Sequence, residues 1–370
     1  MRIGIDAREL CGRSTGVGRY LAGLLSEWAV QDQARGHEFV LYAPSPIILS
    51  LDAHRFPTRT VAGSGGTWWE QVQVPRAVTA DHLDIWFGPA YTVPIRLPMP
   101  IVVAIHDLSF VAHPEWFSAR EGVRRRWLTG QAARHADVVV TISEFSKAEL
   151  IERLGVPQGK IRVVPPGVGS ADSTVPRSPV PTSPRVLFVG SIFNRRHVTD
   201  LIRAFVPIAR AHADASLDIV GDNRSYPRED LRRTIAAEQL VAQVRWHEYV
   251  SDHQLAGLYR EASAFAFLSE YEGLGLTPLE ALAAGVPPLL LDTPVARESC
   301  GAAALYVAMN DLPAITRALE SLLFDADARQ TILDAAPAEL AKFSWARAGR
   351  ETLAILEQCR QVRPSAHVRG

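Results

Sequence analysis

Short apolar runs alternate with longer amphipathic stretches along most of the chain, and this alternation constrains the fold more than any other feature. The runs are rich in valine, isoleucine and phenylalanine, and segments such as 18–30 and 145–154 between them have helical periodicity. Strands that alternate with helices predict a parallel sheet covered by helices on both faces. The expected strands of the first half are 3–6, 39–43, 101–107, 138–143 and 161–165.

Residues 169–184 interrupt this alternation. Their sequence, GSADSTVPRSPVPTSP, is rich in proline and serine and has no apolar periodicity, so it predicts a linker and not part of a core. The alternation then resumes. The expected strands of the second half are 185–191, 217–222, 244–250, 264–269 and 288–292.

The length of the chain agrees with two domains, because 370 residues exceed what one ordinary hydrophobic core organises. We predict two Rossmann-like α/β domains, residues 1–168 and 185–345, joined by the linker and facing a central cleft. Apolar residues at helical spacing predict a terminal helix at 346–362, which we expect to join the first domain.

Charge and cysteine content exclude several functions. A formal net charge of -1 provides no basic field for nucleic acid, and the three cysteines lack the spacing of a disulfide framework or a zinc site. The first residues lack the apolar region of a signal peptide, and no later stretch is long and apolar enough to span a bilayer. We therefore expect a cytoplasmic protein that is soluble or peripheral to a membrane.

The segment SEYEGLGLTPLEALAAG carries the most chemical information. Glu270, Glu272 and Glu280 surround a glycine-rich turn between an expected strand and an expected helix. One interpretation is structural, with Thr277 as N-cap and Glu280 completing a capping box. The other is functional, because backbone amides at a helix N-terminus bind phosphate oxygens and the carboxylates accept hydrogen bonds from sugar hydroxyls.

Three other places are candidates for ligand contacts. Arg195 and Arg196 follow a strand that ends near Gly190 and could neutralise a diphosphate, although a solvated pair at a helix start is the alternative. His106 closes another strand, where open α/β sheets place ligand groups. Gly16 and Gly18 precede an amphipathic helix and let its amides approach a ligand.

Two further patterns argue against other chemistries. Leu21 stands where a dinucleotide-binding fingerprint has its third glycine, which disfavours a nicotinamide oxidoreductase. Asp325-Ala326-Asp327 is the only D-x-D triplet, and helix capping explains it better than a metal ion does. We therefore predict that no metal is required.

Two aromatic segments have competing interpretations. Arginines and a tryptophan at 124–128 suit an anionic membrane surface, but such a run is more often a solvated helix face. Trp68 and Trp69 follow the flexible sequence GSGG and lie either beside a sugar acceptor or against the core of the first domain.

Glu272 and Glu280, with GLGLTPL between them, resemble the E-x7-E motif of the family 4 retaining glycosyltransferases, which have the GT-B fold. The resemblance spans nearly the whole chain and includes IDAREL, TGVGRY, TWWEQ, AIHDLSF, ADVVVTISEFSK, VVPPGV and LFVGS. The usual Arg-Lys pair of this family is Arg-Arg here, and Ser191 stands where some members carry another arginine.

This resemblance implies a role for each candidate residue. Glu272 would hold the hydroxyls of the donor sugar, Glu280 the ribose, and His106 would face the sugar near the reacting centre. Arg195 and Arg196 would stabilise the departing diphosphate. The remaining donor contacts would come from Gly16, Gly18, Gly190, Ser191, Tyr249, Gly273, Leu274, Gly275, Leu276 and Thr277.

The resemblance also implies the activity. It predicts a retaining, metal-independent hexosyltransferase whose donor is a nucleotide-diphospho-sugar and whose acceptor is a saccharide, free or lipid-linked. Similarity to polysaccharide mannosyltransferases favours GDP-mannose, and a lipid-linked acceptor favours peripheral contact with the inner face of the membrane. The alternatives are a nucleotide-sugar epimerase or phosphorylase on the same fold, and a catalytically silent sugar-nucleotide-binding protein.

Overall fold

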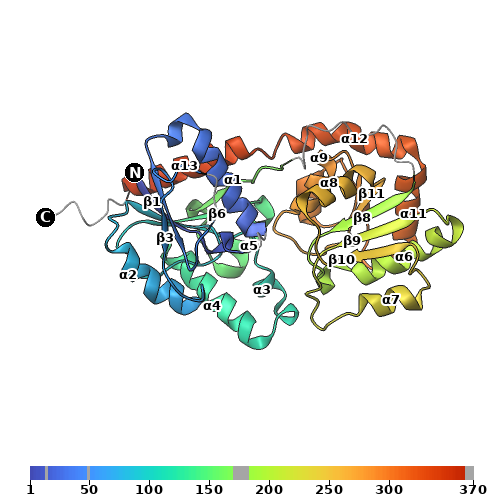
Figure 1. Cartoon of the computed structure of the whole chain (residues 1–370), viewed down its shortest axis with the longest axis horizontal. Coiled ribbons are helices and arrows are strands. Elements are labelled where there is room, and N and C mark those ends of the chain that lie inside the picture. The colour runs from blue at the N-terminus through green and yellow to red at the C-terminus, as the bar shows by residue number, and fades with distance from the viewer. Residues whose placement is uncertain (13–15, 48–50, 170–182, 363–370) are drawn as a thin grey trace. The chain divides into compact units, whose positions relative to one another are not determined.

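The computed structural model describes residues 1–12, 16–47, 51–169 and 183–362. The chain divides into two units, one formed by Met1–Gly167 with Phe343–Gly370 and the other by Val168–Lys342 (Figure 1). Most of the predicted linker, residues 170–182, lies outside the described residues. The predicted α/β class is confirmed, because each unit contains a parallel sheet with helices around it.

Within the described ranges, the first unit contains a seven-stranded parallel sheet in the order β3-β2-β1-β4-β5-β6-β7. This order places β1 beside β4, so the chain reverses its direction of winding between these two strands. In such sheets, ligands bind at the carboxyl ends of the strands on either side of the reversal. The strands are β1 Arg2–Asp6, β2 Glu38–Ala43, β3 Thr58–Thr60, β4 Ile85–Gly88, β5 Ile101–Ala104, β6 Val138–Thr141 and β7 Ile161–Val163.

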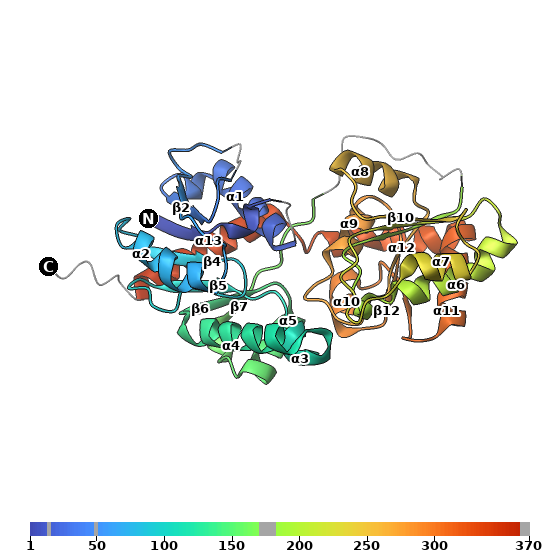
Figure 2. The same ribbon diagram turned by 60° about the horizontal axis from the view of Figure 1, so that its bottom comes forward.

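Helices cover both faces of this sheet (Figure 2). The α-helices are α1 Gly16–Val30, α2 Val74–Val78, α3 Ser109–Ala112, α4 Ala119–His135, α5 Glu144–Leu154 and α13 Trp345–Val362. A π-helix, η3 Trp69–Gln73, precedes α2, and the short 3-10 turns are η1 Arg8–Leu10, η2 Asp32–Ala34, η4 Pro114–Trp116 and η5 Gln158–Lys160.

The C-terminal helix α13 packs against α1 in this unit. The indole nitrogen of Trp28 donates to the carbonyl of Gly349 at 2.9 Å, and Gln31 donates to the carbonyl of Ala346 at 2.9 Å. The Trp345 ring lies so close to Gly23 that a Cβ there would meet it at 2.5 Å. These contacts attach the end of the chain to the unit in which it begins.

The second unit repeats the same winding. Its described residues form a six-stranded parallel sheet in the order β10-β9-β8-β11-β12-β13, with the reversal between β8 and β11. Its strands are β8 Arg185–Val189, β9 Ser216–Val220, β10 Val244–His247, β11 Ala264–Phe267, β12 Pro288–Leu291 and β13 Leu305–Val307. Its helices are η6 Asn194–Arg196, α6 Val198–Ala211, α7 Leu231–Ala237, α8 Asp252–Glu261, α9 Leu276–Ala283, α10 Pro294–Cys300, α11 Leu312–Phe324 and α12 Ala326–Leu340.

Most of the expected strands extend too far at their carboxyl ends, although 3–6 and 39–43 end where predicted. The predicted strand 101–107 ends at Ala104, and 264–269 ends at Phe267. The next residues, Ile105 and Leu268, are still apolar, but the chain leaves the ladder there and turns into a loop. Those loops hold the candidate ligand-binding residues, so each strand ends where its candidate site begins.

Two glycines allow the ends of β8 and β9 to approach each other. Gly190 and Gly221 have φ of 146° and 150°, a region that other residues rarely adopt. A Cβ on Gly221 would lie 1.9 Å from the carbonyl oxygen of Gly190. The backbone therefore requires glycine at this position.

We predict that Gly221→Ala destabilises the second unit by at least about 2 kcal/mol, because it adds both backbone strain and a clash with backbone. Gly257→Ala is the matched control, since Gly257 lies in α8 and a Cβ there meets nothing within 4 Å. The control should gain up to about 1 kcal/mol of helix propensity. Urea unfolding of both variants and the parent tests this, and equal midpoints for Gly221→Ala and the parent would contradict it.

Candidate active site

The predicted charged residues of the second unit come together at its sheet reversal. Arg195 and Arg196 lie in η6, just after β8, and Glu272 lies in the loop after the neighbouring strand β11. The amide of Glu270 donates to the carbonyl of Arg195 at 3.0 Å, which joins the two loops directly. Two cations and a carboxylate therefore share one edge of the sheet.

Arg196 and Glu272 form a salt bridge at this edge. The Nε and Nη2 atoms of Arg196 lie 2.8 and 2.7 Å from Oε1 of Glu272, and the Ser269 hydroxyl donates to the same oxygen at 2.9 Å. The side chains of the pair are only 13% and 17% exposed. With three donors on Oε1, the carboxylate is fixed in orientation. Oε2 accepts no hydrogen bond from the part of the chain that the structure describes.

The guanidinium of Arg196 is also fixed by its surroundings. Its Nη1 donates to the carbonyl of Ser191 at 2.9 Å, and the guanidinium carbon lies 4.8 Å from the centre of the Phe267 ring. Gly190 makes this position possible, because a Cβ there would lie 2.6 Å from Nη1. Arg196 is thus positioned by its carboxylate, a carbonyl and an aromatic ring.

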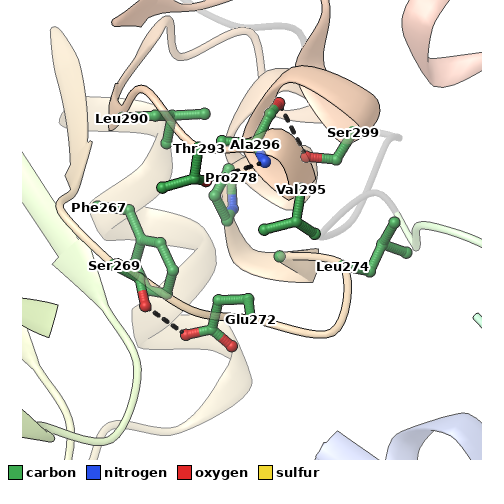
Figure 3. Close-up of a pocket in the computed structure, with 11 residues that line it drawn as sticks. Phe267, Ser269, Glu272, Leu274, Pro278, Leu290, Thr293, Val295, Ala296 and Ser299 are labelled. Carbon is green, nitrogen blue, oxygen red and sulfur yellow. Dashed lines mark hydrogen bonds between the residues drawn. The ribbon is translucent and has the colours of Figure 1, made fainter. Parts of the chain in front are cut away.

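A small pocket that is partly open to solvent adjoins Glu272 (Figure 3). Its walls come from β11, the loop after it and the start of α9, and from β12 and α10. Thr293 and Ser299 use their hydroxyls within α10, where Thr293 accepts from the Ala296 amide at 3.3 Å and Ser299 donates to the Ala296 carbonyl at 3.2 Å. The Glu272 carboxylate is therefore the charged group of the pocket, and Figure 3 shows one of its oxygens turned toward Ser269 and the other away.

The capping box predicted at Thr277 is wrong. Helix α9 begins at Leu276, and its N-cap is Gly275, which has φ of 87° and no side chain. Thr277 is therefore already inside the helix and makes no N-cap hydrogen bond. Glu280 lies a turn further along α9 and is not among the residues that line the pocket.

Ser191 and the loop after β9 form a second polar group beside this edge. The Ser191 hydroxyl donates to Asp222 at 2.6 Å, and Arg224 also donates to Asp222. Burial raises the pKa of Asp222, but these hydrogen bonds outweigh it and hold that pKa below its usual value. Tyr249 follows β10, and its side chain is exposed.

His106 lies in the first unit, two residues after the end of β5, and is buried. Its Nε2 is 2.7 Å from the carbonyl oxygen of Pro89, so this nitrogen donates and carries the proton. The ring packs edge-on against Tyr20 at 4.7 Å and Tyr91 at 5.6 Å between centroids. Burial lowers the pKa of His106 below its usual value, although the Pro89 carbonyl and Asp107 act in the opposite direction.

Gly16 and Gly18 lie at the start of α1, the helix that contacts His106. The described part of α1 begins at Gly16, which is exposed, and Gly18 is buried one residue before Arg19. Tyr20, on the same first turns, packs against the His106 ring. The structure thus brings the glycine segment of α1 and His106 together in one unit.

A buried charge cluster that the residue patterns did not predict lies at the reversal of the first sheet. Arg8 follows β1 and makes salt bridges to Asp6 and Glu70, which are 3% and 1% exposed. Thr92 donates to Glu70 at 2.5 Å. The sequence did contain a signal for this cluster: the charged residues within IDAREL and TWWEQ have apolar neighbours, which predict burial.

Other predictions have mixed outcomes. Asp325 caps α12 by accepting from the amides of Asp327 and Ala328, as the sequence indicated. Trp69 is buried against the core, whereas Trp68 is 68% exposed. Among the described residues, no group of three or more histidine, cysteine or acidic side chains is arranged to hold a metal ion, and no helix could span a membrane.

Comparison with known proteins agrees with the resemblance noted in the sequence. A model of the group 1 glycosyl transferases matches residues 175–338, and a model of glycosyltransferase family 4 matches residues 14–171. A D-inositol 3-phosphate glycosyltransferase of Corynebacterium jeikeium is 30% identical over 290 residues, which are 73% of this chain and 68% of that protein. The chain belongs to glycosyltransferase family 4. O-antigen chain mannosyltransferase B of Escherichia coli is 26% identical over 285 residues, 74% of each chain.

A solved structure extends the comparison to the fold of this family 4 chain. Anabaena HepE, in complex with UDP and glucose, superposes with a TM-score of 0.73 at 17% identity and covers 96% of this chain and 99% of its own. At that identity the likeness concerns the fold, and it confirms the predicted GT-B architecture.

We predict that His106 makes the family 4 chain less stable in acid. Its lowered pKa means that the unfolded chain takes up a proton first as the pH falls below about 6.5. Stability therefore decreases with falling pH until the folded protein is protonated as well. His106→Gln lacks this contribution, so its unfolding free energy should fall less steeply between about pH 7 and about pH 5. Urea titrations at several pH values measure the difference, and parallel profiles would contradict it.

Proposed function

We propose that this family 4 chain is a retaining hexosyltransferase that takes its sugar from a nucleoside-diphosphate donor without a metal ion. The observation that carries the proposal is the pair of Arg196 and Glu272 at the reversal of the second sheet. It combines a fixed cation, suited to phosphate, with a carboxylate whose Oε2 is not used by the described residues. A sugar diphosphate has both chemistries in one molecule.

In this proposal, positive charge at the edge stabilises the departing diphosphate. Arg195 and Arg196 stand side by side in η6, and the amides at the start of α9 add the positive end of a helix dipole. The φ of 87° at Gly275 places those amides after a residue without a Cβ, where phosphate oxygens can come close. The fixed charges require little reorganisation as negative charge develops on the leaving group.

The donor sugar would be held by hydrogen bonds from fixed groups. Oε2 of Glu272 would accept from its hydroxyls, and Glu280 would accept from the ribose. His106 is held neutral with its proton on Nε2, so its Nδ1 would accept from a sugar hydroxyl. Gly16, Gly18, Gly190, Ser191 and Tyr249 complete the proposed donor contacts.

The relatives support the substrate class. The Escherichia coli relative is an O-antigen chain mannosyltransferase, which favours mannose from GDP-mannose, and the HepE complex contains UDP and glucose. We propose a saccharide acceptor, free or lipid-linked, and action on the cytoplasmic side of the membrane with peripheral contact. Product analysis with and without acceptor separates transfer from epimerase or phosphorylase activity.

We predict that Arg196→Ala and Glu272→Ala each lower turnover by at least about 100-fold, because each removes a group that acts on the reacting sugar diphosphate. Glu280→Gln should mainly raise KM for the donor. Glu261→Ala is the control, since Glu261 is paired with Arg185 at the amino end of β8, away from the carboxyl ends where the site lies. The turnover of this variant should stay within about twofold of the parent. Initial rates and circular dichroism are measured together, and parental rates in folded Arg196→Ala and Glu272→Ala would overturn the site assignment.

We also predict that donor binding is independent of metal. Titration calorimetry against GDP, UDP and their mannose, glucose and N-acetylglucosamine conjugates should show one nucleotide family binding equally with Mg²⁺ and with EDTA. Arg196→Ala should weaken that binding by at least about tenfold. Binding that requires Mg²⁺ would contradict the proposal, and binding without transfer to any acceptor would favour a silent nucleotide-sugar-binding protein.

A further inference from the structure

One surface of the first unit exposes large apolar side chains among cations. Trp68 is 68% exposed, and Trp127 and Val123 on α4 are each 58% exposed. The Nη1 atom of Arg124 lies 3.4 Å from the hydroxyl of Thr67, which places the helical start of the segment around Trp68 beside α4. We refer to Trp68, Val123, Arg124, Arg125 and Trp127 as the α4 patch. The two tryptophans that are exposed among the described residues of this unit, Trp68 and Trp127, both belong to the patch.

The arrangement on α4 puts these side chains on the outside of the helix. Trp127 lies three residues after Arg124 and four after Val123, so the three side chains lie on one face of the helix. The opposite face is buried through Leu128, Ala132 and other residues of the core. Figures 1 and 2 both show α4 along the outside of its unit. The helix therefore covers the core with one face and leaves an aromatic and cationic face to solvent.

The charge of this helix is strongly positive. Residues 119–135 contain five arginines and one acidic residue, Glu121, in a chain whose net charge is -1. Arg124 and Arg125, about half exposed, both bond to Glu121 and lower its pKa to about 2, so it remains ionised and offsets one charge. Glu115, exposed before the helix, faces His113. The excess of arginine leaves the patch positive.

The α4 patch adjoins the carboxyl ends of the strands of the first sheet. We call this end of each sheet, where ligands of such folds bind, its ligand edge. Arg126 donates to the carbonyl of Phe110 in α3, which begins just after His106. Trp69, next to Trp68, packs its ring 5.1 Å from the guanidinium of Arg8, which follows β1. Both links connect the patch to the carboxyl ends of the strands, where ligands of such sheets bind.

We propose that the α4 patch docks this protein on the surface of an anionic lipid bilayer. Exposed tryptophans insert at the headgroup level, and arginines attract anionic lipid phosphates. The inference rests on the peripheral membrane contact of the proposed function and names the surface that makes it. Docking there brings the ligand edge of the first sheet close to the lipid, where a lipid-linked acceptor is presented.

Flotation of the full chain with vesicles tests this inference. Vesicles of phosphatidylcholine alone are compared with vesicles that also contain phosphatidylglycerol. We expect binding only to the anionic vesicles, and weaker binding as salt is raised. Trp68→Ser with Trp127→Ser, and separately Arg124→Gln with Arg125→Gln, should each lower vesicle binding at least about tenfold.

A matched pair in the second unit controls for surface change in general. Val241 is 71% exposed and Arg233 is exposed on α7, so Arg233→Gln with Val241→Ser removes a cation and an apolar side chain far from the patch in sequence. This control should bind anionic vesicles like the parent. If the parent does not bind these vesicles, or the patch variants bind as well as the parent, the inference is overturned.

Nucleotide calorimetry on the same variants separates this inference from the proposed function. The patch variants should keep parental affinity for the nucleotide, because the proposed diphosphate contacts lie in the second unit. Vesicle binding without any nucleotide binding would overturn the proposed function and leave the docking surface in place. Loss of a protein partner, with vesicle binding unchanged, would assign the patch to that partner and overturn the bilayer proposal.

Discussion

The salt bridge between Arg196 and Glu272 is the constraint on which the second unit's ligand edge depends. A guanidinium that is mostly buried needs a carboxylate nearby, and a single carboxylate oxygen receives two of its nitrogens together with the Ser269 hydroxyl. Such a pair adds little to stability, because desolvation offsets much of the attraction. Its main effect is to hold two loops in fixed positions. It joins the loop after β8 to the loop after β11, and it requires glycine at Gly190 so that the arginine can pass.

The first unit handles buried charge at the same topological place. Arg8, just beyond β1, is enclosed by Asp6 and Glu70, and its Nη1 donates to the carbonyl of Gly65. Burial alone would lower the pKa of Arg8, but the two carboxylates raise it above its usual value, so the charge is retained. One arginine thereby connects the loop after β1 to the loop after β3 and to η3. In both sheets, an ion pair at the reversal joins loops that lie beyond the strands and are not held by hydrogen bonds between strands.

The sequence predicted the parts of the fold that depend on burial, because a strand buried on both faces must be apolar throughout. It missed β3, whose residues Thr58–Thr60 are polar and exposed at a sheet edge, and the short strands β4 and β13. The helix start at Leu276 was misplaced because a threonine before a proline looks like a cap, whereas the αL conformation of Gly275 is set by the whole loop. The bond from Ser191 to Asp222 depends on two loops 31 residues apart and has no local pattern.

The two units differ in the kind of polar group that each offers at its ligand edge. In the second, charge is available as a cation pair and a carboxylate with one unused oxygen among described residues, which suits a ligand with both phosphate and hydroxyl groups. In the first, charge is internally neutralised around Arg8, and the polar group at the edge is a histidine kept neutral by burial. A neutral imidazole binds a hydroxyl without attracting a second phosphate. This difference in charge supports the proposal that the second unit binds the diphosphate and that the first unit contacts uncharged, hydroxyl-rich parts of the substrates.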